Sequence, residues 1–208
     1  MIPSDEVQAE AAAGWARRLG AQRVDTVSDG SEFGQTMVRA FRQSLQGVRL
    51  TRGHGDLLYY GGGLERISGS LTQASTERVM ASDALLTPPP NGPVRELLIT
   101  SAAEDPSQLP PARHRFLAAF TKRYGRQPGR YAAYGYEAMA VVLDSIQRAG
   151  DQGDDRDAVV DAFFDTQDRA SVLGTYSIDE VGDTTLGRLA GYRLTDGRPR
   201  FQTALLVP

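Results

Sequence analysis

Residues 55–63 read GDLLYYGGG, and this stretch decides how the rest of the chain is interpreted. The apolar and aromatic run from Leu57 to Tyr60 is typical of a strand that is buried on both faces of a parallel sheet. Three glycines follow at once, and glycine lets a backbone turn sharply or approach another group closely. We therefore expect a buried strand that ends at the mouth of a pocket.

The residues before this strand predict the rest of a βαβ unit. Residues 5–19 are rich in alanine, open with a capping-box pattern at Asp5 and Gln8, and stop at a glycine, so we expect a helix. Residues 22–29 then predict a strand, and residues 31–47 predict a helix whose apolar side chains recur at helical spacing.

The residues after the glycines continue the alternation of strand and helix. Residues 64–75 predict a weaker helix, because Gly69 lies inside it. Residues 78–82 predict a short strand, residues 87–93 form a proline-rich break, and residues 94–102 predict a further strand.

The second half of the chain is mainly helical and ends in strands. Helices are predicted at residues 110–125, 130–150 and 154–166. Strands are predicted at residues 172–178, 187–195 and 199–207, of which the last two form a hairpin. The fold class is therefore α/β, with a three-layer, mostly parallel sheet, flanking helices and a C-terminal antiparallel hairpin.

Composition and charge exclude several classes of protein. A net charge of -3 argues against a nucleic-acid-binding protein, whose domains are normally basic. The 22 arginines beside a single lysine, Lys122, reflect genome composition better than a phosphate-binding surface. Without cysteine there is no disulfide framework, thiolate metal site or cysteine nucleophile. The first ten residues lack the basic and apolar regions of an export signal, so a genuine start at Met1 predicts a cytoplasmic protein.

The charged residues of the second half form two blocks of opposite sign. We interpret them as neighbouring solvated helix faces, with a docking surface for a partner as the alternative. The basic block is Arg113, Arg115, Lys122, Arg123, Arg126 and Arg130, and the acidic block is Asp151, Asp154, Asp155, Asp157, Asp161, Asp165 and Asp168.

Catalytic motifs are missing from the sequence. There is no phosphate-binding loop, no complete dinucleotide fingerprint and no nucleophile elbow. His54 and His114 have no metal-ligand spacing and are interpreted as surface residues. We therefore predict no catalytic residue, no metal, no cofactor and no enzyme activity. The missing motifs argue against the alternative hypothesis that the protein is a Rossmann-like enzyme.

Four stretches of the sequence match a known pattern in their residues and in their order along nearly the whole chain. They are residues 4–45, 56–63, 115–150 and 174–197. They resemble the type I periplasmic binding proteins of the Leu/Ile/Val-binding family, which deliver branched-chain amino acids to ABC transporters. The combination F..RYG..P..YAAYGYEA in the third stretch, followed by a Gly-Asp turn, is the most specific part.

The resemblance implies two α/β lobes that close on a small ligand by a hinge motion. Residues 1–101 with 171–208 would form the C-terminal ligand-binding lobe, and residues 102–170 the helical remainder of the N-terminal lobe. The first part of that lobe has no counterpart here, and between Leu45 and Asp56 the family carries an extra strand and helix. The chain is thus either a fragment or a shortened, truncated relative.

The resemblance also implies the ligand-binding residues. Phe33 corresponds to an aromatic residue after the first strand, Tyr60 with Gly61 to the end of the central strand, and Asp83 to a carboxylate that pairs with the ligand ammonium. The physics agrees, because ligands of open α/β sheets bind at the carboxyl ends of the strands. The alternative is that these residues have purely structural roles: Phe33 and Tyr60 would pack in the core, and Asp83 would belong to a turn or a helix cap.

The implied function is capture of an amino acid or similar small polar metabolite for ABC-type uptake, outside the cytoplasm and with a transporter permease as partner. The alternative is a ligand-sensing regulatory domain of the same fold. The helices of residues 111–149 must bury their apolar faces, either on the C-terminal lobe or against a second copy in a homodimer.

Overall fold

The computed structural model describes residues 2–67, 76, 78–86, 96–104, 110–195 and 198–206. The chain divides into two compact units. Residues Ser4–Glu104 and Gly187–Pro208 form the first, here called the sheet unit. Residues Met1–Pro3 and Asp105–Leu186 form the second, here called the helical unit.

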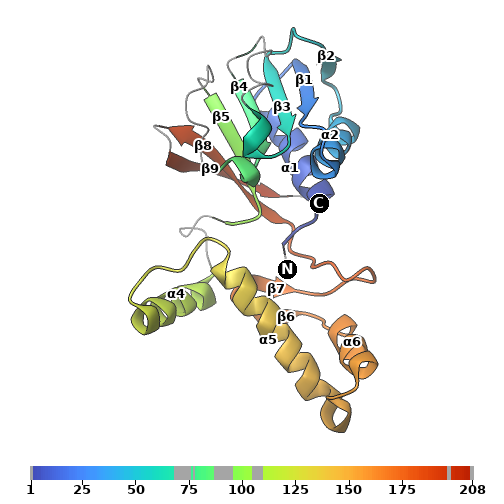
Figure 1. Ribbon diagram of the computed structural model, residues 1–208, viewed down its shortest axis with the longest axis vertical. Helices are drawn as coiled ribbons and strands as arrows, with labels where there is room; N and C mark the ends of the chain where they lie inside the picture. The colour runs from blue at the N-terminus through green and yellow to red at the C-terminus, as the bar shows by residue number, and fades with distance from the viewer. Residues whose placement is uncertain are drawn as a thin grey trace. The chain divides into compact units, whose positions relative to one another are not determined.

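The sheet unit is built on seven strands in the order β2-β1-β3-β4-β5-β8-β9 (Figure 1). The strands β1 to β5 pair in parallel, whereas β8 pairs antiparallel with both β5 and β9. This confirms the α/β class, the mostly parallel sheet and the C-terminal hairpin. The bounds are β1 Arg23–Ser28, β2 Arg49–Thr51, β3 Leu57–Gly61, β4 Arg78–Ser82, β5 Glu96–Ser101, β8 Arg188–Thr195 and β9 Arg198–Leu206.

Two helices cover one face of this sheet. They are α1, Asp5–Arg18, and α2, Glu32–Ser44. Tyr59 of β3 points to this face, where its ring stacks on Phe41 of α2 with ring centroids 3.8 Å apart. Burial of this face is what holds the two helices on the sheet, because their other sides are polar.

Tyr60 points to the opposite face, as expected for the next residue of a strand. The register aligns it with Val27 of β1 and Ala81 of β4, and Ala81 in turn with Ile99 of β5. Tyr60, Ala81 and Ile99 belong to a second buried cluster, which also contains Leu58, and partly buried Val27 packs against it. The predicted strand is thus buried on both faces, with Tyr59 and Tyr60 on opposite sides.

The start of α1 corrects one detail of the sequence analysis. The capping residue is Ser4, whose Oγ accepts a hydrogen bond from the Val7 amide, and not Asp5, which lies in the first turn of the helix. The predicted glycine stop is confirmed, since Gly20 adopts a φ of 76° directly after the helix. At such a φ any side chain would be strained.

The described residues of the helical unit form three α-helices and a two-stranded antiparallel sheet of β6 and β7 (Figure 1). Their bounds are α4 Pro111–Tyr124, α5 Ala132–Ala149, α6 Arg156–Phe164, β6 Arg169–Ser171 and β7 Gly174–Tyr176. The three helices were predicted, and Gly125 ends α4 in the left-handed conformation as expected. A one-turn 3-10 helix, Gly150–Gln152, follows α5.

Two predicted features fall partly or wholly outside the described residues. Of the helix at residues 64–75, only residues 64–67 are described, and they are helical. The proline-rich break at residues 87–93 lies outside the described residues. Two three-residue strands, β2 and β6, were not predicted.

Candidate functional site

The glycines of the opening stretch bring α2 into contact with the end of β3. A Cβ atom on Gly61 would lie 2.4 Å from the carbonyl oxygen of Gly34, and a Cβ on Gly34 would lie 2.5 Å from the carbonyl oxygen of Gly61. Neither distance is compatible with a side chain, so the two glycines allow backbone to pack against backbone. Of the two uses that the sequence analysis gives for these glycines, a sharp turn or a close approach to another group, this geometry shows the close approach. The ligand role of Gly61 stays a prediction.

Asp29 ties together three segments at this edge of the sheet. Its Oδ1 accepts hydrogen bonds from the amide and the hydroxyl of Ser31, at 2.9 and 2.5 Å. Its Oδ2 accepts one from the Gly63 amide at 3.0 Å, and Arg66 donates to its backbone carbonyl. Burial opposes ionisation, but the hydrogen bonds from Ser31 and Gly63 and the charge of Arg66 outweigh it and lower the pKa of Asp29. The loop after β1 is therefore anchored by a stably ionised carboxylate.

Tyr60 has no exposed surface, and its hydroxyl donates a hydrogen bond of 2.9 Å to the carbonyl oxygen of Gly63. Burial and the negative charge of Asp29 raise its pKa to about 12. The ring packs within the sheet, and only the hydroxyl is directed to the glycine turn. This arrangement does not test whether Tyr60 contacts a ligand, so that contact stays a prediction.

Asp83 follows β4 and begins a one-turn 3-10 helix, Asp83–Leu85. Its Oδ2 accepts a hydrogen bond from the Ser101 hydroxyl at 3.2 Å, and its Oδ1 accepts one from Gln8 Nε2 at 3.4 Å. Gln8 is buried and also donates to the carbonyl oxygen of Thr100 at 2.8 Å. The acid is thus held at the carboxyl ends of β4 and β5 by polar groups, and it remains partly exposed.

Asp5 is a second carboxylate of this neighbourhood. Burial, the charge of Glu6 and the charge of Asp83 raise its pKa, in that order of size. Two acids that repel each other favour a cation between them, because a positive charge relieves the repulsion. Sequence reasoning missed Asp5, Gln8 and Ser101 as neighbours of Asp83. The only sequence feature that drew attention to Asp5 and Gln8 was their spacing, which was interpreted as a helix cap.

Phe33 lies in the first turn of α2 and packs, partly buried, against the cluster that contains Tyr59. The hydroxyl of Tyr60 is directed to Gly63 and the carboxylate of Asp83 to Gln8 and Ser101, so the predicted residues share the carboxyl edge of one sheet without converging in these contacts. The carboxylates of Asp5 and Asp83 interact electrostatically at this edge, beside the amide of Gln8 and the hydroxyl of Ser101.

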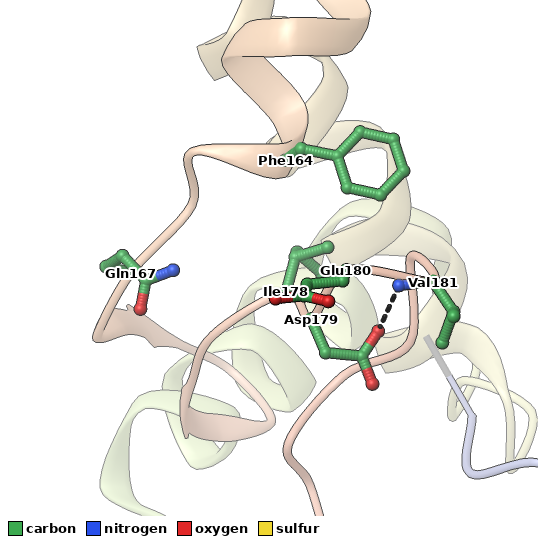
Figure 2. A pocket seen from close by; sticks show the side chains of 6 residues that line it. All are labelled: Phe164, Gln167, Ile178, Asp179, Glu180 and Val181. Atoms are coloured by element: carbon green, nitrogen blue, oxygen red, sulfur yellow. Dashed lines mark hydrogen bonds between the residues drawn. The ribbon is translucent and has the colours of Figure 1, made fainter.

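The helical unit has a pocket of about 620 Å³ between the end of α6 and the loop after β7 (Figure 2). Phe164 forms one wall, and Asp179, Glu180 and Val181 form the other. The Asp179 carboxylate accepts hydrogen bonds from the amides of Val181 and Asp183, at 3.0 and 2.8 Å. This acid therefore shapes its own turn, and none of the predicted ligand residues lines the pocket.

The described part of the chain contains no helix that is both long and apolar enough to cross a membrane. Within those same residues, no three His, Asp or Glu side chains are grouped so that they could hold a metal ion.

Comparison with known families identifies the fold. The model of the family described as periplasmic binding protein matches residues 81–198, which is more than half of the chain. The chain belongs to the periplasmic binding protein family. No curated protein sequence matches this periplasmic binding protein significantly.

Solved structures give the same result at low sequence identity. The leucine-binding protein LivK from Thermotoga maritima matches with a TM-score of 0.81 and 24% identity, over 99% of this chain and 67% of its own. A substrate-binding protein of an ABC transporter from Desulfitobacterium hafniense, in complex with leucine, matches at 0.78 and 20%, over 97% and 66%. A solute-binding protein from R. palustris, in complex with benzoate, matches at 0.72 and 13%, over 98% and 64%. This periplasmic binding protein thus spans about two thirds of the length of these relatives.

Proposed function

We propose that the chain captures a small molecule bearing an ammonium group, such as an amino acid, for uptake through an ABC transporter, and that it does so without chemistry. The observation that carries this proposal is the position of Asp83 at the carboxyl edge of the parallel sheet, with Asp5 close enough to interact electrostatically. A buried or half-buried ammonium needs paired carboxylates to offset the loss of its hydration.

The family resemblance suggests a role for each of the two units. The sheet unit would correspond to the C-terminal ligand-binding lobe, predicted at residues 1–101 with 171–208, and the helical unit to the remainder of the N-terminal lobe, predicted at residues 102–170. Residues 171–186, which that prediction gives to the C-terminal lobe, lie in the helical unit. The chain would act outside the cytoplasm and pass the ligand to a transporter permease. Solved relatives that bind leucine and benzoate support a small carboxylic acid as the ligand class.

A thermal-shift titration tests the ligand class. The 208-residue chain is titrated with amino acids and, for each, with the carboxylic acid that lacks the amino group. Ligand at about 100 times its Kd adds about 2.7 kcal/mol to the free energy of unfolding. We expect the melting temperature to rise by several degrees with an amino acid and to stay unchanged with its deaminated analogue.

Matched variants locate the site. Asp83→Asn should abolish the rise, because the ammonium loses its paired charge, whereas Glu10→Gln, an exposed carboxylate of the same unit, should leave it intact. A rise produced equally by benzoate and by amino acids, or one that survives Asp83→Asn, would refute the proposed ammonium site. No rise with any ligand of the panel would refute capture by this chain.

A further inference from the structure

A polar groove lies in the sheet unit between β1 and α2, which are neighbours in Figure 1. The strand β2 pairs only with Arg23–Asp25 of β1, whereas β1 continues to Ser28 and pairs along its other side with β3. Within the described residues, no strand therefore pairs with the outer side of Thr26–Ser28. The groove has a volume of about 390 Å³, which is in the range of small-molecule sites.

Two arginines of α2 line this groove. The side chains of α2 at the groove recur at helical spacing, so they form one flank of the helix beside its buried face. Arg39 and Arg42 are three positions apart and are therefore neighbours on that flank. Their guanidinium groups can reach one group bound between them. The lining residues are Thr26 and Ser28 of β1 and Gln35, Val38, Arg39, Arg42 and Gln43 of α2.

Each of the two arginines is oriented by a hydroxyl group and is not neutralised by an acid. Arg42 Nε donates a hydrogen bond of 2.7 Å to Thr26 Oγ1, and a terminal nitrogen of Arg39 donates one of 3.2 Å to Thr36 Oγ1. Neither arginine forms an ion pair with a carboxylate of the described residues. Other arginines of the sheet unit do have a carboxylate partner, namely Arg23, Arg78, Arg188 and Arg193.

The groove offers hydrogen-bond donors and no carboxylate. Thr26 Oγ1 accepts a hydrogen bond from Arg42, and Ser28 Oγ accepts one from the Gly30 amide, so each hydroxyl keeps its hydrogen to donate. None of the residues that line the groove is an aspartate or a glutamate. Two guanidinium groups beside two hydroxyls are complementary to an oxyanion. A phosphate group fits this set best, because it carries nearly two negative charges on one compact group.

We propose that this groove binds a small molecule through its phosphate group. Arg39 and Arg42 supply the positive charge, and the hydroxyls of Thr26 and Ser28 supply further donors. Val38 is buried in the wall of the groove and gives an apolar surface to the rest of the molecule. The strand β3 lies between β1 and β4, and Asp83 follows β4, so this site is separate from the proposed ammonium site.

Calorimetric titration with inorganic phosphate is the first test. With the ionic strength held constant by sodium chloride, the 208-residue chain should bind one phosphate saturably. Arg39→Gln and Arg42→Gln should each raise the Kd about 10-fold, and both changes together about 100-fold. Arg18→Gln, at an exposed arginine of α1 outside the groove, is the matched control and should leave the Kd unchanged. Absence of saturable binding, or equal losses in the groove variants and the control, would overturn the proposal.

A second set of titrations locates the bound group and identifies its source. Thr26→Val removes the hydroxyl beside Arg42 and should raise the Kd about 5-fold, whereas an unchanged Kd would place the phosphate outside the groove. The urea transition of buried Trp15 shows that each variant is folded. Glycerol 3-phosphate should bind as well, and succinate, whose charges lie on separate groups, at least about 10-fold more weakly. Equal binding of succinate, failure of glycerol 3-phosphate to bind, or binding only to phosphatidylglycerol vesicles would overturn the proposal.

Discussion

The sheet unit and the helical unit differ in how completely their own residues bury their apolar surface. The sheet unit has buried clusters on both faces of its sheet, including fully buried Tyr59 and Tyr60. In the helical unit, α6 contains no buried residue and α4 buries only Arg113. The first unit therefore has the larger apolar core, whereas the second combines a few buried apolar side chains, such as Val141 and Tyr176, with the polar contacts of Glu137.

The largest effect should come from the glycine contact between α2 and β3. Gly61→Ala would place a Cβ 2.4 Å from the Gly34 carbonyl oxygen, and the backbone on both sides would have to move. We expect the free energy of unfolding of the sheet unit to fall by about 3 kcal/mol. The fluorescence of Trp15, which is the only tryptophan and is buried in the sheet unit, reports this transition in urea.

Gly63→Ala is the control for that prediction. No atom of the described residues lies within 4 Å of a Cβ at Gly63, so the variant should change stability by less than about 0.5 kcal/mol. Equal destabilisation by the two variants would mean that the close approach of α2 and β3 is not what requires glycine.

The helical unit should respond most to the loss of its buried acid. Glu137 is 2% exposed and is bonded to Arg169, so Glu137→Gln breaks a largely buried ion pair. We expect a loss of about 2 kcal/mol, less than for a fully buried pair because Arg169 keeps some solvent contact. Hydrogen exchange in β6 and β7 should accelerate about 30-fold, while the Trp15 transition should not change.

Asp144 provides the matched comparison in the same network. It accepts a hydrogen bond from Arg169 at 2.9 Å, but its side chain is 40% exposed. Asp144→Asn should therefore cost less than about 1 kcal/mol. A cost equal to that of Glu137→Gln would show that burial does not decide the strength of these two pairs.

The carboxylate of Asp29 should make the stability of the sheet unit depend on pH. Its pKa is lower in the folded chain than the ordinary value of 3.8, so its contribution is complete above pH 3.8 and is lost as the pH falls through the folded value. At pH 7, Asp29→Asn should cost about 1 kcal/mol, since solvent reaches the group. The difference between variant and wild type should shrink below pH 3.8. A difference that stays constant down to pH 3 would contradict this assignment.

Much of the fold was predictable because local patterns and packing agree. Leu57 to Tyr60 form a run that is typical of a strand buried on both faces, and Gly125 marks the end of its helix by its conformation. The two missed strands, β2 and β6, are three residues long and contain no fully buried side chain. Their structure depends on pairing with a neighbour, which a local apolar pattern does not record.

The candidate site was only partly predictable, because the fold assembles it from distant segments. Asp83 was expected at the end of a strand, but Gln8, which donates to it, is separated from it by 75 positions in the sequence. Asp5 and Gln8 fit a helix cap by their spacing, and this local explanation hid their place beside Asp83. What decides such neighbours is the packing of α1 over the ends of β4 and β5.

The two adjacent tyrosines offer the smallest effects, because each prediction concerns a single hydroxyl group. The Tyr60 hydroxyl donates to Gly63, whereas the buried hydroxyl of Tyr59 has no hydrogen-bond partner among the residues that the structure describes. Tyr60→Phe should therefore cost about 0.5–1 kcal/mol, and Tyr59→Phe should be neutral or stabilising, because it removes an unsatisfied polar group and keeps the stack on Phe41. Urea unfolding followed through Trp15 measures both, and equal costs would mean that the bond to Gly63 contributes nothing to the fold.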